Sequence, residues 1–233
     1  MTRNELIIYT VGMLAATNLF GLLYSYIVLN TSVFKKFRIQ DKAYKPQVFK
    51  ERFGLYFINL LMLIAFSASG VYFIFELFDT KDFTLWVIAL QVFITFVMDD
   101  FWFYFMHRYF HENKYLLRKI HSIHHRSHTP FPMEYLYGHP LEWMTGTIGV
   151  VLGFATIYLF FGSINVYAFL AFGFLRNLHE IHIHSDLELP IVSKIPFLSK
   201  TRHHDDHHSK LDGNYSSTFT WMDRIFKTTF RAK

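Results

Sequence analysis

The sequence contains no cysteine, and this absence excludes several kinds of site. Disulfides, thiolate metal sites, iron–sulfur clusters and cysteine nucleophiles all require that residue. Charged residues are also scarce, at 18% of the 233 residues, whereas 52% are hydrophobic and 20% aromatic. With a positive mean hydropathy, this composition indicates an integral membrane protein rather than a soluble domain. The net charge of +5 does not indicate a nucleic-acid partner, because the cations gather beside apolar runs.

Five apolar segments are candidates for insertion into a bilayer, where a spanning helix needs about 20 apolar residues. The last two are short and are separated only by Gly162 and Ser163, so we expect them to form a hydrophobic hairpin over residues 143–178. The sequence therefore predicts an all-α integral membrane protein with about four to five transmembrane or re-entrant helices. The five segments are residues 6–29, 55–78, 83–106, 143–161 and 164–178.

The distribution of cations predicts the orientation of these segments. Seven Lys or Arg residues lie between the first two spans, whereas Lys81 alone lies between the second and third. The positive-inside rule then places the first loop in the cytoplasm. We expect one membrane domain, residues 1–233, in which residues 1–106 are mainly transmembrane and residues 107–142 and 179–233 form a cytoplasmic, histidine-rich helical metal cap.

All 14 histidines lie from His107 onward, in the two segments that the charge rule places together. On a helix, residues three and four apart share a face, so these rings can point at one metal. The alternative, crowded histidines without metal, would require a hydrogen-bond partner for each buried ring. The groups are His107 and His111 in HRYFH, His121, His124 and His125 in HSIHH, His204, His207 and His208 in HDDHH, and His179, His182 and His184 in LHEIHIHSD.

The number of imidazoles favours two metal ions, because one tetrahedral zinc needs only four ligands. Imidazole suits iron, zinc, copper or nickel, so the residues alone do not name the element. His128 is expected to face solvent or support a ligand, His139 to be a ligand or to support one, and His203 to point away from its box. Carboxylates available to accept hydrogen bonds from ligand rings are Asp100, Glu142, Glu180, Asp186, Asp205 and Asp206.

The three histidine boxes, in this order on a membrane protein, resemble the fatty acid hydroxylase/sterol desaturase superfamily. The resemblance covers roughly residues 95–230, and two stretches, HTPFPMEYLYGHPLE and HHDDHHSKLDGNYSSTFTWMDRIFKT, are most similar to its methylsterol oxidases, which oxidise carbon-4 methyl groups of sterols. The chain departs from that branch at residues 184–187, where His-Ser-Asp-Leu replaces His-Ser-Gly-Tyr. A sterol methyl group and a fatty-acyl chain therefore both stay open as substrates.

The resemblance implies a non-haem diiron oxygenase that uses O2 to hydroxylate an unactivated C–H bond of a lipid, with zinc as the alternative metal. It also implies electrons from NAD(P)H, delivered by a b-type cytochrome or ferredoxin-like carrier and its reductase. A tenth ligand stays open among Glu180, His182, His179 and His139, and Asp100 and Glu142 are expected to support ligands. The implied ligands are His107, His111, His121, His124, His125, His184, His204, His207 and His208.

Other functions of membrane proteins share some of these sequence features. A lipid desaturase of the same superfamily begins with the same hydrogen abstraction and stays an alternative. A membrane zinc metallohydrolase would need fewer ligands and a Glu base. A transporter or haem protein would place histidines within the spans, and the predicted spans hold none away from their ends. The C-terminal Arg-Ala-Lys lacks a dilysine retrieval signal, so we expect either a bacterial inner membrane or the endoplasmic reticulum.

Overall fold

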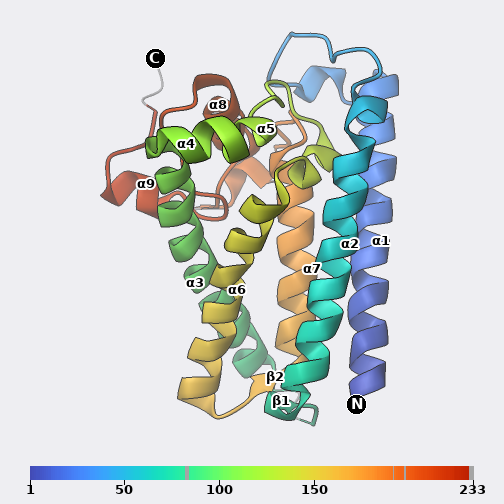
Figure 1. Ribbon diagram of the computed structural model, residues 1–233, viewed down its shortest axis with the longest axis vertical. Coiled ribbons are helices and arrows are strands. Elements are labelled where there is room, and N and C mark those ends of the chain that lie inside the picture. The colour runs from blue at the N-terminus through green and yellow to red at the C-terminus, as the bar shows by residue number, and fades with distance from the viewer. Residues whose placement is uncertain (82–83, 191, 197, 231–233) are drawn as a thin grey trace.

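The computed structural model describes residues 1–81, 84–190, 192–196 and 198–230 (Figure 1). Five long helices form its main part: α1 (Arg3–Asn30), α2 (Val48–Ile74), α3 (Leu85–Glu112), α6 (Pro140–Phe161) and α7 (Val166–Ile183). Shorter elements are η1 (Lys35–Phe37), η2 (Phe75–Leu77), α4 (Lys114–Leu116), the π-helical η3 (Leu117–His121), α5 (Ser122–His124), η4 (Pro132–Leu136), η5 (Val192–Lys194), α8 (Thr201–Lys210) and α9 (Trp221–Ile225).

The long helices form a bundle with two different ends (Figure 1). At one end lies the N-terminus, beside the two-residue strands β1 (Phe78–Asp79) and β2 (Ile164–Asn165), which pair in parallel. At the other end lies the cap, which we define as residues 31–47, 113–139, 184–190, 192–196 and 198–230. The structure thus places both histidine-bearing segments at one end of the bundle.

The prediction of an all-α membrane protein is confirmed. Four helices are long and apolar enough to cross a membrane: Arg3–Asn30, Val48–Leu77, Leu85–Glu112 and Pro140–Phe161. The predicted start of the third span, residue 83, lies outside the described residues, as do residues 231–233. The second helix begins seven residues before the predicted span at residue 55, because hydropathy marks the membrane and not the helix end. Its start follows Gln47, whose φ of 60° breaks the helical path.

Two glycines of α6 explain its close packing against α3. A Cβ atom at Gly149 would lie 2.9 Å from Asp99, and one at Gly153 would lie 2.9 Å from Thr95. Only glycine allows the two backbones to approach so closely. On the outside of the bundle, Phe73 and Leu159 are about four-fifths exposed, at 79% and 81%. Such an apolar exterior suits contact with lipid tails.

The first loop is clamped onto the cap through Asp186. Its carboxylate accepts hydrogen bonds from Arg38 Nε at 2.8 Å and the Gln40 amide at 2.9 Å. Asp186 adopts a φ of 58°, in the left-handed region that favours glycine and tolerates Asp. Asp186 therefore combines an unusual backbone conformation with an anchor for the first loop.

Candidate metal centre

Four segments bring nine histidines into the cap. The last two turns of α3 supply His107 and His111 on one face, and His184 caps the C-terminal end of α7. The second box lies on η3 and α5, and the third lies on α8. All nine side chains are buried, with at most 8% of each residue exposed. The nine are His107, His111, His121, His124, His125, His184, His204, His207 and His208.

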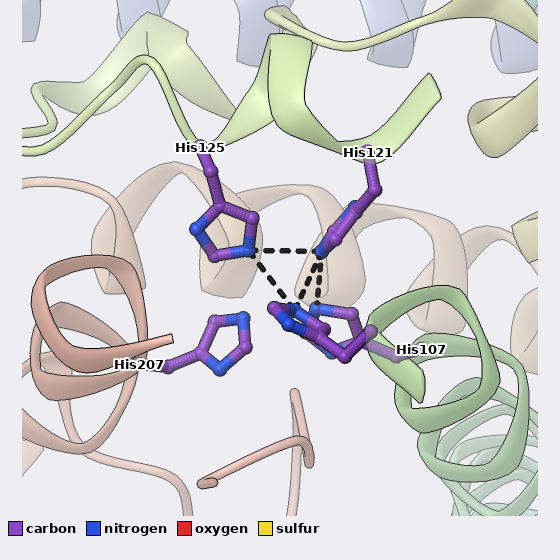
Figure 2. Close-up of side chains that lie close together, drawn as sticks. His107, His121, His125 and His207 are labelled. Carbon is purple, nitrogen blue, oxygen red and sulfur yellow. Dashed lines mark hydrogen bonds between the residues drawn. The ribbon is translucent and has the colours of Figure 1, made fainter. Parts of the chain in front are cut away.

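Five of these residues form one group, which we call the five-histidine cluster: His107, His111, His121, His125 and His207. Their ligand atoms lie within 4.8 Å of one another. In Figure 2 the four labelled rings, from α3, η3, the end of α5 and α8, point toward a common centre. The Nε2 atom of His121 lies 3.1 Å from that of His107 and 2.9 Å from those of His111 and His125.

The other four residues form the four-histidine cluster: His124, His184, His204 and His208. Here the Nε2 atom of His204 lies 3.0 Å from that of His184 and 3.1 Å from that of His208. Both HxxHH boxes are divided between the clusters, whereas the sequence analysis placed each box on a single stripe. Successive residues of α8, His207 and His208, point in different directions because they are about 100° apart around the helix.

Backbone carbonyls fix the protonation of several rings. The Nδ1 atom of His107 lies 2.7 Å from the Tyr215 carbonyl oxygen, and that of His207 lies 2.7 Å from the Gly213 oxygen. The same contact joins His124 to Tyr137 at 2.9 Å and His184 to Glu180 at 2.8 Å. A carbonyl only accepts, so each Nδ1 carries the hydrogen and each neutral ring turns the lone pair of Nε2 inward.

This arrangement fits metal ions. Glu142 Oε1 lies 2.9 Å from His121 Nδ1 without the alignment of a hydrogen bond, and the carboxylate favours a hydrogen on Nδ1, which leaves Nε2 unprotonated as in His107. Two such lone pairs 3.1 Å apart repel each other unless a cation lies between them. The side-chain nitrogen His207 Nε2 is also buried and has no partner among the described residues. A metal-bound histidine that passes its other N–H to a carboxylate or carbonyl is the common arrangement in metalloproteins.

Burial keeps these rings neutral. It lowers the pKa of His121 to about 3 and, with the neighbouring His124 adding to the effect, that of His184 to about 4. The pKa values of His204, His207 and His208 are lowered well below the usual range, first by burial and then by neighbouring histidines. Metal ligation requires neutral imidazole, so the rings are prepared for it at neutral pH.

The four residues considered for a tenth ligand lie outside both clusters. His179 Nε2 lies 3.0 Å from the Ser217 carbonyl oxygen, and His182 Nε2 lies 3.3 Å from Thr201 Oγ1. Glu180 Oε1 accepts from Ser217 Oγ at 2.6 Å. His139 caps α6, with Nδ1 accepting from the Leu141 amide at 3.1 Å.

Carboxylates expected near the ligands have varied contacts. Glu142 supports His121 directly, as described above. Asp100 instead accepts from the Thr218 amide at 2.8 Å and Trp221 Nε1 at 2.9 Å, so it fastens the C-terminal segment to α3. Asp205 accepts from Gln40, and Asp206 pairs with Lys210.

The structure also shows the surroundings of His203 and His128, whose roles the sequence did not decide. The His203 ring lies 3.0 Å from Asp223 Oδ2. Asp223 also accepts from the Tyr215 amide at 2.9 Å, next to the carbonyl that orients His107. His128 is exposed, in agreement with the expectation that it faces solvent.

Glu134, in the cap, was not among the residues predicted to support the site. Its carboxylate is fully buried and contacts Arg52, Tyr56 and Ser127, joining α2 to the segment after the second box. The signal available in the sequence was a single acid within the apolar stretch PFPMEYLY. A carboxylate in such surroundings needs a partner, but the sequence does not name it.

A cavity of about 600 Å³ leads from the four-histidine cluster into the bundle. His124, His184 and His204 line its upper end, and Leu77 and Ile164 line the end near the strands. Its walls come from α1, α2, α3, α6 and α7 and are mainly apolar. The cavity therefore offers a lipid a path from the interior of the bundle to the four-histidine cluster.

Comparison with known proteins decides the family. A model of the family described as "Fatty acid hydroxylase" matches residues 92–228, which include all nine clustered histidines. The chain belongs to the fatty acid hydroxylase family. No solved structure matches it.

The chain is similar to relatives with two different protein names. "Methylsterol monooxygenase 1" of Rattus norvegicus is 34% identical over 209 residues, covering 83% of the chain and 67% of the relative. The protein of the same name from Gallus gallus is 32% identical, covering 83% and 66%. A "Very-long-chain aldehyde decarbonylase" of Oryza sativa subsp. indica is also 32% identical, covering 84% and 74%. The chain thus spans about two thirds of the length of the two animal relatives.

Proposed function

We propose that the chain is a membrane lipid oxygenase with two iron ions, which uses O2 to hydroxylate an unactivated C–H bond. The observation that carries the proposal is the pair of histidine clusters with inward-facing lone pairs, one of which closes the end of an apolar cavity. The five-histidine and four-histidine clusters would each hold one iron ion. All nine histidines are therefore proposed as ligands, and the ligand set needs no tenth residue.

The bound irons would supply dioxygen activation and the removal of a hydrogen atom from carbon. The residues of the chain orient the ligand rings and position the lipid. Carbonyls of Tyr137 and Glu180 orient the His124 and His184 rings, and Glu142 orients His121. The apolar cavity walls exclude water and hold the lipid with its reacting carbon below the four-histidine cluster. Nothing in this arrangement assigns a histidine as an acid or base.

Two classes of lipid stay within the proposal. The animal relatives named as methylsterol monooxygenases support a sterol methyl group as the target. The family description supports a fatty-acyl chain. We place the sterol first, because both animal relatives, whose matches cover 83% of the chain, carry that name.

The oxygenase would need an electron donor and an orientation in the membrane. Hydroxylation places one oxygen atom of O2 in the lipid and reduces the other to water with two electrons. We propose that NAD(P)H supplies them through a b-type cytochrome or ferredoxin-like carrier and its reductase. The seven cations of residues 35–52 lie at the cap end of the bundle, which supports a cytoplasmic cap on the endoplasmic reticulum or a bacterial inner membrane.

Metal analysis tests the proposal directly. Protein purified anaerobically from iron-replete cells should contain about two irons per chain by elemental mass spectrometry, and His124→Ala should lose iron. Reduced protein should then consume O2 when a 4-methylsterol is added and form a hydroxymethyl product. Two zinc ions that persist under iron-replete expression, without O2 consumption, would instead favour the zinc metallohydrolase. Absence of bound metal would refute the assignment of the clusters.

A further inference from the structure

Arg176 is a cation in the wall of the apolar cavity. It lies on α7, and its guanidinium is paired with Asp99 on α3 through an Nε–Oδ2 contact of 2.6 Å. An ionisable residue at this depth is costly unless it has a partner or a function. The ion pair with Asp99 uses the Nε donor of the guanidinium and leaves its other N–H donors to be accounted for.

The two terminal nitrogens of the guanidinium are also hydrogen-bond donors. Nε donates to Asp99, but the part of the chain that the structure describes provides no hydrogen-bond acceptor for the two terminal nitrogens of Arg176. The side chain is 26% exposed, whereas Asp99 is 3% exposed. Because Arg176 lines the cavity, this exposed portion is available to a molecule inside it.

Glu180 lies one helical turn further along α7 and lines the same cavity. Residues four apart share a helix face, so Arg176 and Glu180, with Asn177 beside them in the lining, form a polar step on a mainly apolar wall. With a rise of about 1.5 Å per residue, the two Cα atoms lie about 12 Å and about 6 Å along the helix axis from that of His184. The step therefore lies just below the four-histidine cluster.

The charges around the step decide what it can bind. One guanidinium faces two carboxylates, those of Asp99 and Glu180, so the formal charge is negative. A fatty acid carboxylate would be repelled there. A neutral hydroxyl group can accept from Arg176 and donate to Glu180, whose carboxylate can accept this hydrogen bond in addition to the one from Ser217.

We infer that Arg176 and Glu180 bind the hydroxyl group of a neutral lipid alcohol, and so select a sterol-like substrate over a fatty acid. The inference rests on the proposed function in one respect, namely that the cavity holds the substrate. Arg176 acts here as a specificity-determining residue and Glu180 as its partner.

Ligand pairs that differ only in the polar group provide the test. The full chain in phosphatidylcholine nanodiscs, without O2 or reductant, is titrated with tritiated 5α-cholestan-3β-ol and competed with unlabelled 5α-cholestane. A hydrogen bond to a charged group should give the alcohol about a tenfold or greater advantage over the hydrocarbon. The same comparison of palmitate with hexadecane should give palmitate no such advantage.

Variants assign the preference to the polar step. Arg176→Met combined with Asp99→Asn removes the cation without leaving a buried unpaired carboxylate, and should abolish the preference for the alcohol. Arg176→Lys should retain part of it. Arg3→Met is the matched control, because Arg3 also forms one ion pair, with Glu76 at 2.8 Å, outside the residues that line the cavity. Metal content and thermal unfolding establish that each variant is folded.

Several results would overturn the inference. Equal binding of cholestanol and cholestane by the unmodified chain would do so, as would an alcohol preference that survives in the double variant. A larger advantage for palmitate would show that the step binds a carboxylate instead. The binding assay needs no turnover, so an inactive oxygenase would leave it unaffected. Conversely, iron-dependent turnover without the preference would refute this inference alone.

Discussion

The two histidine clusters differ in how they meet the rest of the molecule. None of the five-histidine cluster lines the cavity, whereas three members of the four-histidine cluster do. The first has five rings and a carboxylate contact from Glu142, and the second has one ring fewer. A metal site with fewer protein ligands has room for an exchangeable one. The difference suggests that the lipid binds next to the four-histidine cluster, whereas the five-histidine cluster lies further from the cavity.

The largest expected difference comes from two adjacent residues, His207 and His208. His208→Ala leaves three ligands in the four-histidine cluster, so we expect bound iron to fall from about two to about one per chain. Turnover should fall by about a thousandfold, equivalent to about 4 kcal/mol of transition-state stabilisation. His207→Ala leaves four ligands in its cluster and should retain both irons. Elemental mass spectrometry and turnover on one preparation measure both. Equal metal loss in the two variants would contradict the division of α8 between clusters.

Glu142→Gln tests the support behind the five-histidine cluster. Glu142 contacts His121 Nδ1 at 2.9 Å, and loss of such a partner lowers metal affinity by about 10- to 100-fold. Competition with a chelator should therefore remove one of two irons more readily than in the unmodified chain. Glu51→Gln, in an exposed pair with Lys45, is the control and should change nothing. Unchanged chelator resistance in Glu142→Gln would argue against its role.

Two glycines of α6 allow a comparison between a position packed against α3 and a position that faces open space. A Cβ at Gly149 would lie 2.9 Å from Asp99 on the helix that carries His107 and His111, whereas a Cβ at Gly146 would meet nothing within 4 Å. Gly149→Ala should lower the free energy of unfolding by about 1–3 kcal/mol through overpacking. Gly146→Ala should leave it unchanged or raise it by up to about 1 kcal/mol. Thermal unfolding in detergent distinguishes them, and similar shifts in both would count against the close α3–α6 packing.

The smallest effect is expected at the Asp186 clamp, two residues after His184. Arg38→Met removes the 2.8 Å ion pair but leaves the Gln40 amide on Asp186, so the loss should be about 1 kcal/mol. Arg202→Met, in an exposed pair with Glu188, should cost less than about 0.5 kcal/mol. Thermal unfolding of both variants compares the two losses of stability. A larger loss of stability for Arg202→Met than for Arg38→Met would contradict the importance of the Asp186 clamp.

The sequence predicted features that depend on local spacing and composition. Hydropathy over some 20 residues located the long helices, and the spacings in HRYFH, HSIHH and HDDHH grouped the histidines, because helical faces follow from residue numbers alone. The residues indicated the group His179, His182 and His184, but the choice of His184 within it came only from the family resemblance. The helix starts at Val48 and Pro140 were missed, since polar first turns do not raise hydropathy.

Features that depend on how distant segments dock were beyond the sequence. Neighbouring residues of a helix point in different directions, but which cluster receives His207 or His208, and which receives His124 or His125, depends on what each ring faces across the cap. The carbonyls that fix the tautomers belong to Tyr137, Glu180, Gly213 and Tyr215, and a carbonyl has no residue signature. The Asp99–Arg176 pair was likewise hidden, because averages over an apolar window absorb single charges.

Helices α1 and α2 supply walls of the cavity but no clustered histidine, and they lie outside the residues that match the family model. The chain therefore has a histidine-bearing part, whose helices α3, α6 and α7 also line the cavity, and an N-terminal part that supplies cavity wall without a clustered histidine. Diversification of substrate within such an architecture can proceed by changes in α1 and α2 while the histidine-bearing part is inherited unchanged. For an engineer, Leu63, Ser67 and Gly70 on α2 are positions at which a library could alter lipid choice without touching a proposed metal ligand.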